Sequence, residues 1–541
     1  MKVVCEEHVE PKTFLQKYMN EDATIMEYFE YPLNTDGLIE RYEDVNKRSY
    51  DRSGLIEALK NFNAQFTDDK DTFSQIDRIK MDNSVVVVGG QQAGLLTGPI
   101  YTINKIISII HEASVIEREL NVPVVPIFWI AGEDHDIDEV NHTYFHQRST
   151  TRKLVLKERN DLKIPVSNRQ IRMEEGKQLI NEGLKFLKET PYIKKLYESL
   201  MNDLKEDVTY VDWFAKIIHR IFKGTGLVLM DAADINIRKL EKPYFKEMLE
   251  NNDEIRSSFY EVAKKFKDSG FGEPIEIDKS NAHLFVHDQG QRFLLEKDGA
   301  HFREKNSGRK WIISELLEKL EGNPDHFSNN VVTRPVMQDK LLPVISFVAG
   351  PGELKYWATL KKVFHSSGIT MPLVYPRVQI AFLSRRTEKN LAWMNKSPHD
   401  VTMNGVESEK IAWRKENTPI EISDPFDKLK KEMEKSLDNL ATELQPLGDL
   451  QFIHERQREI IANDLILYEK RINKYVENHQ MFALKKFDEV AVEIKPEGNL
   501  QERYLNILPF LNQYGPDAIL GLLKDLHKEK TLVGKFLYVY L

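Results

Sequence analysis

An unbroken run of four valines followed by a glycine-rich stretch, VVVVGGQQAGLLTGP at residues 85–99, constrains the fold most. Consecutive β-branched apolar residues are typical of a strand that is buried on both faces. Gly90, Gly94 and Gly98 allow the backbone to turn sharply and to approach a ligand closely. Thr97 then favours the start of a helix. The pattern predicts a strand, a loop and a helix N-terminus that together bind an anion or nucleotide. A tight turn that binds nothing is the alternative.

Further short apolar runs predict a parallel sheet. The helix after the first strand leads to a second β-rich run, so these segments form a βαβ unit with a right-handed crossover. Longer charged or alternating segments separate the remaining runs, which predicts two insertions, near 145–222 and 240–325, with a hairpin in the second. Ligands of such sheets bind beyond the carboxyl ends of the strands. The five predicted strands lie near 85–88, 122–131, 226–231, 342–349 and 371–375.

The strongest chemical signal is the sequence GEDHD at residues 132–136, directly after the second strand. His135 is a candidate general base, and Asp134 or Asp136 would fix its tautomer. Glu133 and its acidic neighbours are alternative ligands for Mg²⁺, which prefers oxygen. A solvated helix N-terminus is the third interpretation, because acidic side chains suit the helix dipole.

Residues after the other strands add binding candidates at the same edge. An arginine there suits a carboxylate or phosphate, and glycines after the fourth strand repeat the pattern of the first loop. The alternative for each is a loop or surface role. Besides the residues named above, the candidates are Gln91, Gln92, Asp231, Asn329, Asn330, Arg334, Gly350, Gly352, Glu353, Tyr356 and Arg377. The sequence predicts no metal site that is formed by protein side chains alone.

Composition narrows the class of protein. The net charge of −9 gives no general attraction to nucleic acid or to anionic membranes. A single cysteine, Cys5, excludes an intramolecular disulfide and a multi-cysteine zinc site. Residues 1–11 lack the apolar centre of a signal peptide, and the longest apolar run is too short to span a bilayer. We therefore expect a cytoplasmic protein.

Apolar spacing divides the chain into segments. Residues 1–82 read as helical, 83–386 as the sheet core with its insertions, 387–500 as a helical arm and 501–541 as a segment that packs back on the core. In the arm, two long helices flank a Pro-Leu-Gly break, and the second carries apolar residues alternately three and four apart. This predicts an antiparallel coiled coil that favours a homodimer or only braces its own domain. The seam is Ile461, Leu465, Tyr468, Ile472, Tyr475, His479 and Phe482.

Known nucleotide-binding motifs do not match the first loop. It lacks the Gly-Lys-Ser/Thr of a P-loop and the G-x-G-x-x-G of dinucleotide-binding folds, which argues against hydride transfer. The arrangement is closer to the core of class I aminoacyl-tRNA synthetases and nucleotidylyltransferases, although the HIGH tetrad is replaced by residues 96–99, LTGP.

Five longer motifs resemble one family specifically: GGQQAGLLTGPIYTINKIISII, FWIAGEDHDIDEVNH, FSNNVVTRPVMQD, FVAGPGELKYW and LNQYGP. They are similar to the cysteine-adding enzymes, or cysteine ligases, of bacillithiol biosynthesis, and the resemblance runs from the first strand to the C-terminus. It implies a Rossmann-like core with two connecting insertions, a coiled-coil arm, a homodimer and binding of ATP or ADP.

The resemblance also implies a carbon–nitrogen bond-forming ligase that adds cysteine to glucosaminyl-malate. ATP would activate the cysteine carboxylate, with Mg²⁺ as an optional companion. Backbone N–H groups near Thr97 and Gly98 would bind anionic oxygens, and Asn330, Arg334 and Arg377 would clamp the malate carboxylates. The alternatives are a nucleotidyl or glycosyl transferase that uses the same crevice, and a non-catalytic coiled-coil partner protein that senses a nucleotide.

Overall fold

The computed structural model describes residues 2–7, 13–158, 162–288, 290–418 and 421–541. Part of the segment considered above for a signal peptide, residues 8–11, lies outside these ranges. The chain forms two compact units. The first comprises Met1–Gln147, Thr151–Ser384 and Asn499–Leu541, and the second comprises Arg148–Thr150 and Arg385–Gly498.

The first unit is built on a five-stranded parallel sheet, and all five predicted strands belong to it. The valines of β2 alternate between two hydrophobic cores: Val85 and Val87 face one, and Val86 and Val88 face the other. A strand buried on both faces is therefore confirmed. The sheet order is β13 (Leu373–Pro376), β12 (Val344–Ala349), β2 (Val85–Gln91), β3 (Val124–Ile130) and β6 (Val228–Asp231).

This order places a topological switch point between β2 and β12, because the chain leaves the centre of the sheet in opposite directions on either side. In doubly wound folds the ligand crevice opens at this point, beyond the carboxyl ends of the strands. Helix α6 (Tyr101–Leu120) packs on β2, β3 and β12. The other helices of the core are α1 (Phe14–Met19), α2 (Ala23–Met26), α3 (Thr35–Asn46), α4 (Arg52–Asn63), α5 (Lys70–Arg78), α15 (Pro351–Trp357) and α16 (Lys361–Ser366).

Two insertions interrupt the sheet. The first holds α7 (Ile137–Val140), the hairpin β4 (His142–Gln147) and β5 (Thr150–Val155), α8 (Met173–Phe186), α9 (Ile193–Asp203) and α10 (Tyr210–Ile221). The second holds α11 (Ile235–Glu250), α12 (Asn252–Phe266), α13 (Ile313–Gly322), α14 (Thr333–Leu341) and an antiparallel sheet. The predicted hairpin is part of that sheet, whose order is β10 (Lys310–Ile312), β9 (His301–Glu304), β8 (Gln291–Asp298), β7 (Asn281–Asp288) and β11 (Phe327–Asn329).

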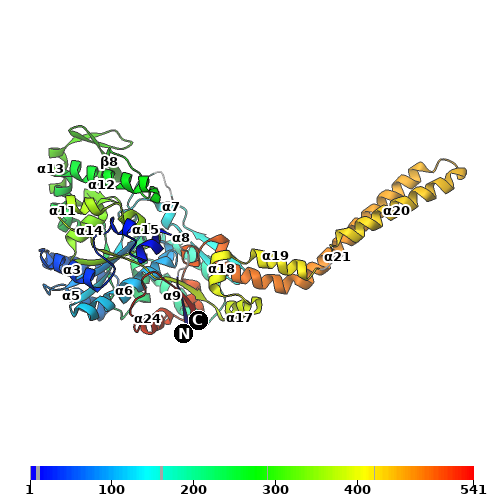
Figure 1. The fold of residues 1–541 in the computed structure, drawn as a ribbon, viewed down its shortest axis with the longest axis horizontal. Coiled ribbons are helices and arrows are strands. Elements are labelled where there is room, and N and C mark those ends of the chain that lie inside the picture. The colour runs from blue at the N-terminus through cyan, green and yellow to red at the C-terminus, as the bar shows by residue number, and fades with distance from the viewer. Residues whose placement is uncertain (1, 8–12, 159–161, 289, 419–420) are drawn as a thin grey trace. The chain divides into compact units, whose positions relative to one another are not determined.

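The chain ends meet in a third sheet, where the structure differs from the helical start expected for residues 1–82. Strand β1 (Lys2–Glu7) pairs antiparallel with β15 (Lys535–Tyr540), which pairs parallel with β14 (Gln379–Leu383). The N and C labels accordingly lie together in Figure 1. The C-terminal segment thus belongs to the first unit, with α22 (Gln501–Tyr504), α23 (Leu508–Tyr514) and α24 (Ala518–Leu526).

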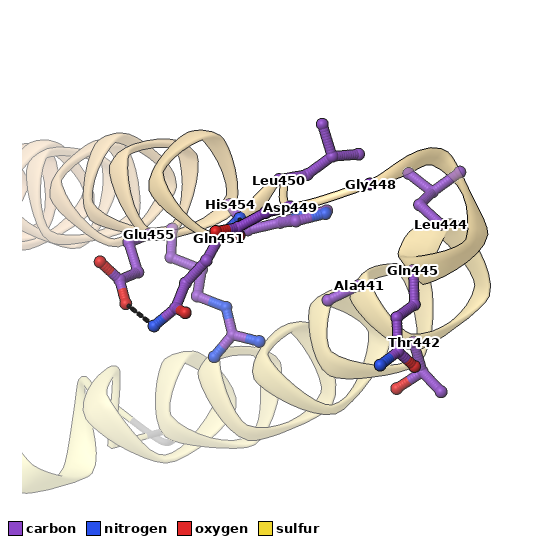
Figure 2. A pocket seen from close by; sticks show the side chains of 11 residues that line it. Ala441, Thr442, Leu444, Gln445, Gly448, Asp449, Leu450, Gln451, His454 and Glu455 are labelled. Carbon is purple, nitrogen blue, oxygen red and sulfur yellow. Dashed lines mark hydrogen bonds between the residues drawn. The ribbon is translucent and has the colours of Figure 1, made fainter.

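The second unit is helical and contains the predicted hairpin arm. Helices α20 (Ser423–Leu444) and α21 (Gln451–Ile494) run side by side (Figure 1). The base of α21 packs on α17 (Arg385–Met394), α18 (Pro398–Asn404) and α19 (Glu407–Glu416). Figure 2 shows the turn between the two long helices, where Gln451 donates a 2.8 Å hydrogen bond to Glu455 beside a pocket of about 670 Å³. No helix in the described part of the chain is long and apolar enough to cross a membrane.

The predicted seam of α21 separates into two stripes. Ile461, Leu465 and Ile472 are half-buried, whereas Tyr468, Tyr475 and Phe482 are 54, 60 and 76 % exposed. A helix with two apolar stripes can contact one neighbour within its own hairpin and a second one elsewhere. The seven seam residues are spaced three and four apart and so lie on one side of α21, but within the hairpin only part of this side is covered, and Tyr468, Tyr475 and Phe482 stay exposed.

Candidate functional site

The glycines at the end of β2 serve strand packing. Strand β2 extends through Gly89 and Gly90, which were expected in the loop. A Cβ atom on Gly90 would lie 2.8 Å from the Trp129 carbonyl oxygen of β3, and one on Gly89 would lie 3.1 Å from the Val348 carbonyl oxygen of β12. The first distance is shorter than a side chain tolerates and the second is tighter than most side chains show, so glycine here allows neighbouring strands to approach.

The loop from β2 to α6 is strained. Leu96, Thr97 and Gly98 have φ values of +51°, +83° and +67°, and a positive φ is costly for a β-branched residue. A Cβ atom on Gly94 would lie 2.7 Å from the Gly98 Cα atom, so the loop folds tightly on itself. Helix α6 begins only at Tyr101, after this turn. The Thr97 side chain is fully buried, and its hydroxyl has no partner within the described residues.

Asn506 of the C-terminal segment holds this loop. Its side-chain amide donates to the carbonyl oxygens of Leu96 and Gly98, at 2.7 and 2.8 Å, and to the Thr143 hydroxyl at 3.1 Å. The same side chain accepts the Leu508 N–H at 2.8 Å and is fully buried. A strained backbone persists only where its surroundings fix it, and Asn506 provides that support.

Lys105 of α6 lies at the switch point and was not among the predicted residues. Its ammonium donates to the Gly90 carbonyl oxygen at 2.6 Å, to Gln91 Oε1 at 3.1 Å and to Glu353 Oε2 at 2.5 Å. Glu353 also accepts the Gly350 N–H at 2.6 Å, at the start of α15. Burial lowers the pKa of Lys105, against the opposing effect of Glu353. Lys105 thus joins the two glycine-bearing turns across the switch point.

The two predicted arginines differ in their contacts. Arg377 is 5 % exposed, and its two terminal nitrogens donate to the Glu502 carboxylate at 2.5 and 2.8 Å. Glu502 therefore occupies the fork that was expected to bind a substrate. Arg334 donates to the Tyr356 hydroxyl at 2.8 Å, but its buried Nε has no partner within the described residues.

The acidic cluster at 132–136 is organised by arginines from the second insertion. Arg238 of α11 donates to the Glu133 carboxylate, which also accepts the Asn329 N–H at 3.3 Å. Gln92 donates to Asp134 at 2.7 Å. Burial alone would raise the pKa of Asp134, but the Arg292 charge and the Gln92 hydrogen bond lower it overall.

His135 has a different neighbour from the one expected. Arg292 Nη1 lies 3.2 Å from His135 Nδ1, whereas the nearest Asp134 oxygen is 3.9 Å from that atom. A guanidinium only donates, so Nδ1 accepts and the ring carries its proton on Nε2. Burial and the Arg292 charge lower the pKa of His135, which keeps the ring neutral. Asp136 is exposed at the start of α7 and does not fix the ring.

Asn329 and Asn330 also play different roles. The Asn330 side chain accepts the Val332 N–H at 2.8 Å and contacts His283 Nδ1 at 3.0 Å, so it stabilises its own turn. Asn329 is 1 % exposed, and within the described residues neither its amide oxygen nor its amide nitrogen has a partner. A buried unpaired amide is rare, so Asn329 is a candidate contact for a ligand or an ordered water.

Asp231, the predicted residue at the end of β6, has internal partners. Its carboxylate accepts from the Ser167 hydroxyl at 2.7 Å and from the Ala233 N–H at 3.2 Å, and burial raises its pKa to about 7. A Cβ atom on Gly132 would lie 1.9 Å from the Ser167 hydroxyl oxygen. These contacts connect the residues that follow the carboxyl ends of β3 and β6. Gly352 is exposed on α15, with open space around it.

The described residues contain no group of three or more His, Cys, Asp or Glu side chains that could hold a metal ion. Glu133, the expected Mg²⁺ ligand, is neutralised by Arg238. The donor set therefore does not fit a metal site made by the protein alone.

Comparison with known proteins identifies similar chains. A profile described as "Bacillithiol biosynthesis BshC, N-terminal Rossmann-like domain" matches residues 1–378, and one described as "Bacillithiol biosynthesis BshC, C-terminal coiled-coil domain" matches residues 380–539. Proteins named "Putative cysteine ligase BshC" are similar over nearly their whole length. Those of Bacillus cytotoxicus and Bacillus licheniformis are 34 and 36 % identical over 505 and 508 residues, which cover 93 and 94 % of this chain and 94 % of each relative.

Proposed function

The chain belongs to the BshC family of bacillithiol biosynthesis, and from this membership we propose that it is a cysteine ligase. In this proposal it forms an amide bond between the cysteine carboxylate and the amine of glucosaminyl-malate. The reaction places the protein among carbon–nitrogen ligases.

Buried polar groups without a protein partner carry the proposal. The Thr97 hydroxyl follows β2, the Asn329 amide is at the end of β11, and Arg334 Nε follows the Asn330 turn. None of the three is paired within the described residues. Unpaired buried donors and acceptors are costly, so a polar ligand is the economical explanation. Each of them suits a carboxylate, phosphate or hydroxyl oxygen of a ligand.

ATP is the proposed co-substrate, because a carboxylate is a poor acyl donor. Attack of the cysteine carboxylate on the α-phosphorus releases pyrophosphate and gives an adenylate, and the amine then displaces AMP. Attack on the γ-phosphorus instead releases ADP and gives an acyl phosphate, from which the amine displaces phosphate. In both routes the amine loses one proton as the amide forms.

We assign His135 as a hydrogen-bond donor through Nε2–H in this reaction. Its Nδ1 faces Arg292, and burial together with the Arg292 charge lowers the pKa of the ring and favours its neutral form, so Nε2–H can orient a substrate oxygen. Phe285 supports the pair: its ring lies 3.7 Å from the Arg292 guanidinium carbon and 6.1 Å from the His135 ring centre. This role replaces that of a general base held by an aspartate.

The proposal is tested by incubating the purified chain with cysteine, glucosaminyl-malate and ATP and measuring the thiol product together with AMP and ADP. We expect His135→Ala to lower kcat/KM about 10–100-fold and His135→Gln, which keeps an N–H donor, to recover part of the loss. His301→Ala, at an exposed histidine of β9, is the control. Equal losses in both His135 variants would favour a general base. If no combination of these substrates yields a thiol product, the proposed ligase function is contradicted.

The arm is proposed to join two copies of the chain. On α21, two exposed apolar rows recur every seven residues, Ile453, Ile460 and Leu467 and then Tyr468, Tyr475 and Phe482, as at a coiled-coil interface. We expect Ile460→Glu with Leu467→Glu to convert a dimer into a monomer in sedimentation equilibrium, because charges oppose burial of the row. Glu459→Lys, beside the row, is the control. A monomeric wild-type chain contradicts the proposal.

A further inference from the structure

Amide formation releases a proton from the attacking amine, so the proposed reaction needs a general base near the reacting atoms. His135 does not supply one, because its Nδ1 faces Arg292 and its Nε2 therefore carries the hydrogen. Glu133 is 4 % exposed and is paired with Arg238. Another carboxylate near the switch point is therefore needed.

Two further carboxylates that follow strands are occupied by hydrogen bonds. The Asp134 oxygens accept from the Gln92 amide and from the His135 N–H, each at 2.7 Å. The Asp231 oxygens accept from a hydroxyl at 2.7 Å and from a backbone N–H at 3.2 Å. Protonation of either carboxylate would weaken these hydrogen bonds, because a neutral carboxyl group is a poorer acceptor than a carboxylate.

Glu353 of α15 is placed differently. Its Oε2 atom accepts from Lys105 Nζ at 2.5 Å and from the Gly350 N–H at 2.6 Å, whereas its Oε1 atom accepts no hydrogen bond within the described residues. The Lys105 side chain is 2 % exposed, and the Glu353 side chain is 21 % exposed. One carboxylate oxygen is thus fixed by a buried cation and a backbone N–H, and the other is open to solvent.

A helix cap is the simplest role for Glu353, because a glutamate at the third helical position often accepts the N–H at the helix start. Glu315 has this role in α13: it is exposed and accepts the Ile312 N–H at 3.0 Å, without an ion pair within the described residues. A cap alone does not explain why Lys105 holds the same oxygen of Glu353, because burying an ammonium group is costly.

Glu353 lies beside Arg334. Tyr356 follows Glu353 by three residues on α15, so the two side chains are on the same side of the helix. The Tyr356 hydroxyl accepts from Arg334 at 2.8 Å. Burial alone would lower the pKa of Arg334, but Tyr356, Glu353 and two further carboxylates raise it overall. The unpaired Arg334 Nε and Glu353 Oε1 therefore place a donor and an acceptor in one neighbourhood.

We propose that Glu353 is the general base of the amide-forming step and that its Oε1 atom accepts the amine proton, a role that rests on the proposed ligase function. The amine nitrogen bonds to the activated acyl carbon of cysteine, and its proton passes to Oε1. The acyl C–O bond breaks with its electron pair going to the departing phosphate oxygen, and Glu353 then returns the proton to solvent. Arg334 holds an oxygen of the acyl phosphate or adenylate, and Lys105 positions the carboxylate through Oε2.

Hydroxylamine separates this step from the activation of cysteine. It takes the place of the amine and converts activated cysteine into its hydroxamate, and it is small enough to pass its proton directly to water. We expect Glu353→Gln to lower kcat for amide formation about 100-fold or more. Formation of cysteine hydroxamate, with ATP but without glucosaminyl-malate, should keep the wild-type rate. Glu315→Gln, at a glutamate that only caps a helix, is the matched control and should change neither rate.

Two further variants separate the base from a folding effect. Lys105→Met/Glu353→Gln removes both members of the buried pair, so that no charge is left stranded. It should lose amide formation and retain hydroxamate formation, as Glu353→Gln does. Glu353→Ala leaves space for a small carboxylate, and added formate should raise its rate of amide formation without raising that of the wild type.

Two results would overturn the role of Glu353 and leave the ligase function intact. An unchanged rate of amide formation in Glu353→Gln is the first. Equal losses of hydroxamate and amide are the second, because Glu353 would then act in activation or in the structure of the site. A wild-type chain that forms neither hydroxamate nor thiol product contradicts the ligase function itself, and the role of Glu353 with it.

Discussion

Replacing Glu502 by alanine is expected to lower the free energy of unfolding by about 3–5 kcal/mol, because it leaves the buried Arg377 guanidinium without a counter-charge. Glu502 is 1 % exposed and also accepts from Asn104 at 2.8 Å and from Gln379 at 3.1 Å. One carboxylate thus satisfies donors from α6, from the β13–β14 connection and from β14. Urea unfolding of the purified variant measures the loss.

Two comparisons separate the buried pair from a general effect of removing a glutamate. Glu250→Ala breaks an exposed 3.9 Å pair with Lys246 and should leave stability unchanged within error. The double variant Arg377→Met/Glu502→Leu should recover most of the loss, because neither charge is then stranded. If Glu502→Ala unfolds at the same urea concentration as the wild type, the pair is not a structural element.

The acid dependence of stability has a defined direction. Burial alone would raise the pKa of Glu502, but Arg377 and the hydrogen bonds hold it below its ordinary value of 4.5. A carboxyl whose pKa is lowered on folding stabilises the folded chain above its unfolded pKa. That contribution is lost as the pH falls through the folded value. The difference between the wild type and Glu502→Ala should therefore shrink on acidification below about pH 4.5.

The strands could be predicted from the sequence because their signals are local. Each buried parallel strand is a short apolar run between turn residues, and the valines of β2 show directly why such a run is continuous. The strand order, and with it the switch point, depends on how the crossovers pass over the sheet. Strand β1 was missed because it is defined by pairing with β15 at the other end of the chain.

The sequence predicted which residues follow the strands at the ligand edge, but it did not predict which side chains they contact. Arg377 and Arg334 appeared equivalent in the sequence, since each follows an element that ends at the ligand edge. Only the fold shows that Glu502, 125 residues after Arg377, occupies one fork. Lys105 was overlooked because it is the only charged residue in the apolar first half of α6, residues 101–110, although a lysine on such a buried face is itself a signal. Arg292 lies in a hairpin whose docking the sequence does not encode locally.

Arg334→Met is expected to lower kcat/KM for amide formation about 10²–10³-fold, the usual cost of removing one preorganised donor from an active site. Stability should change little, because within the described residues the Arg334 side chain makes one hydrogen bond, to Tyr356, and its Nε has no partner. This is the opposite of the result expected for Glu502→Ala. The measurement pairs initial rates over a range of each substrate with urea unfolding, and the KM that rises identifies the anion that Arg334 holds.

Arg334→Lys and Arg172→Met are the comparisons for this variant. Lysine keeps the charge but lacks the planar fork, so it should recover part of the activity if charge matters and little if bidentate geometry is required. Arg172 is exposed before α8, and its replacement should leave the rate unchanged. Full activity in Arg334→Met contradicts a substrate role. A stability loss as large as that of Glu502→Ala would show instead that Arg334, like Arg377, is a structural arginine.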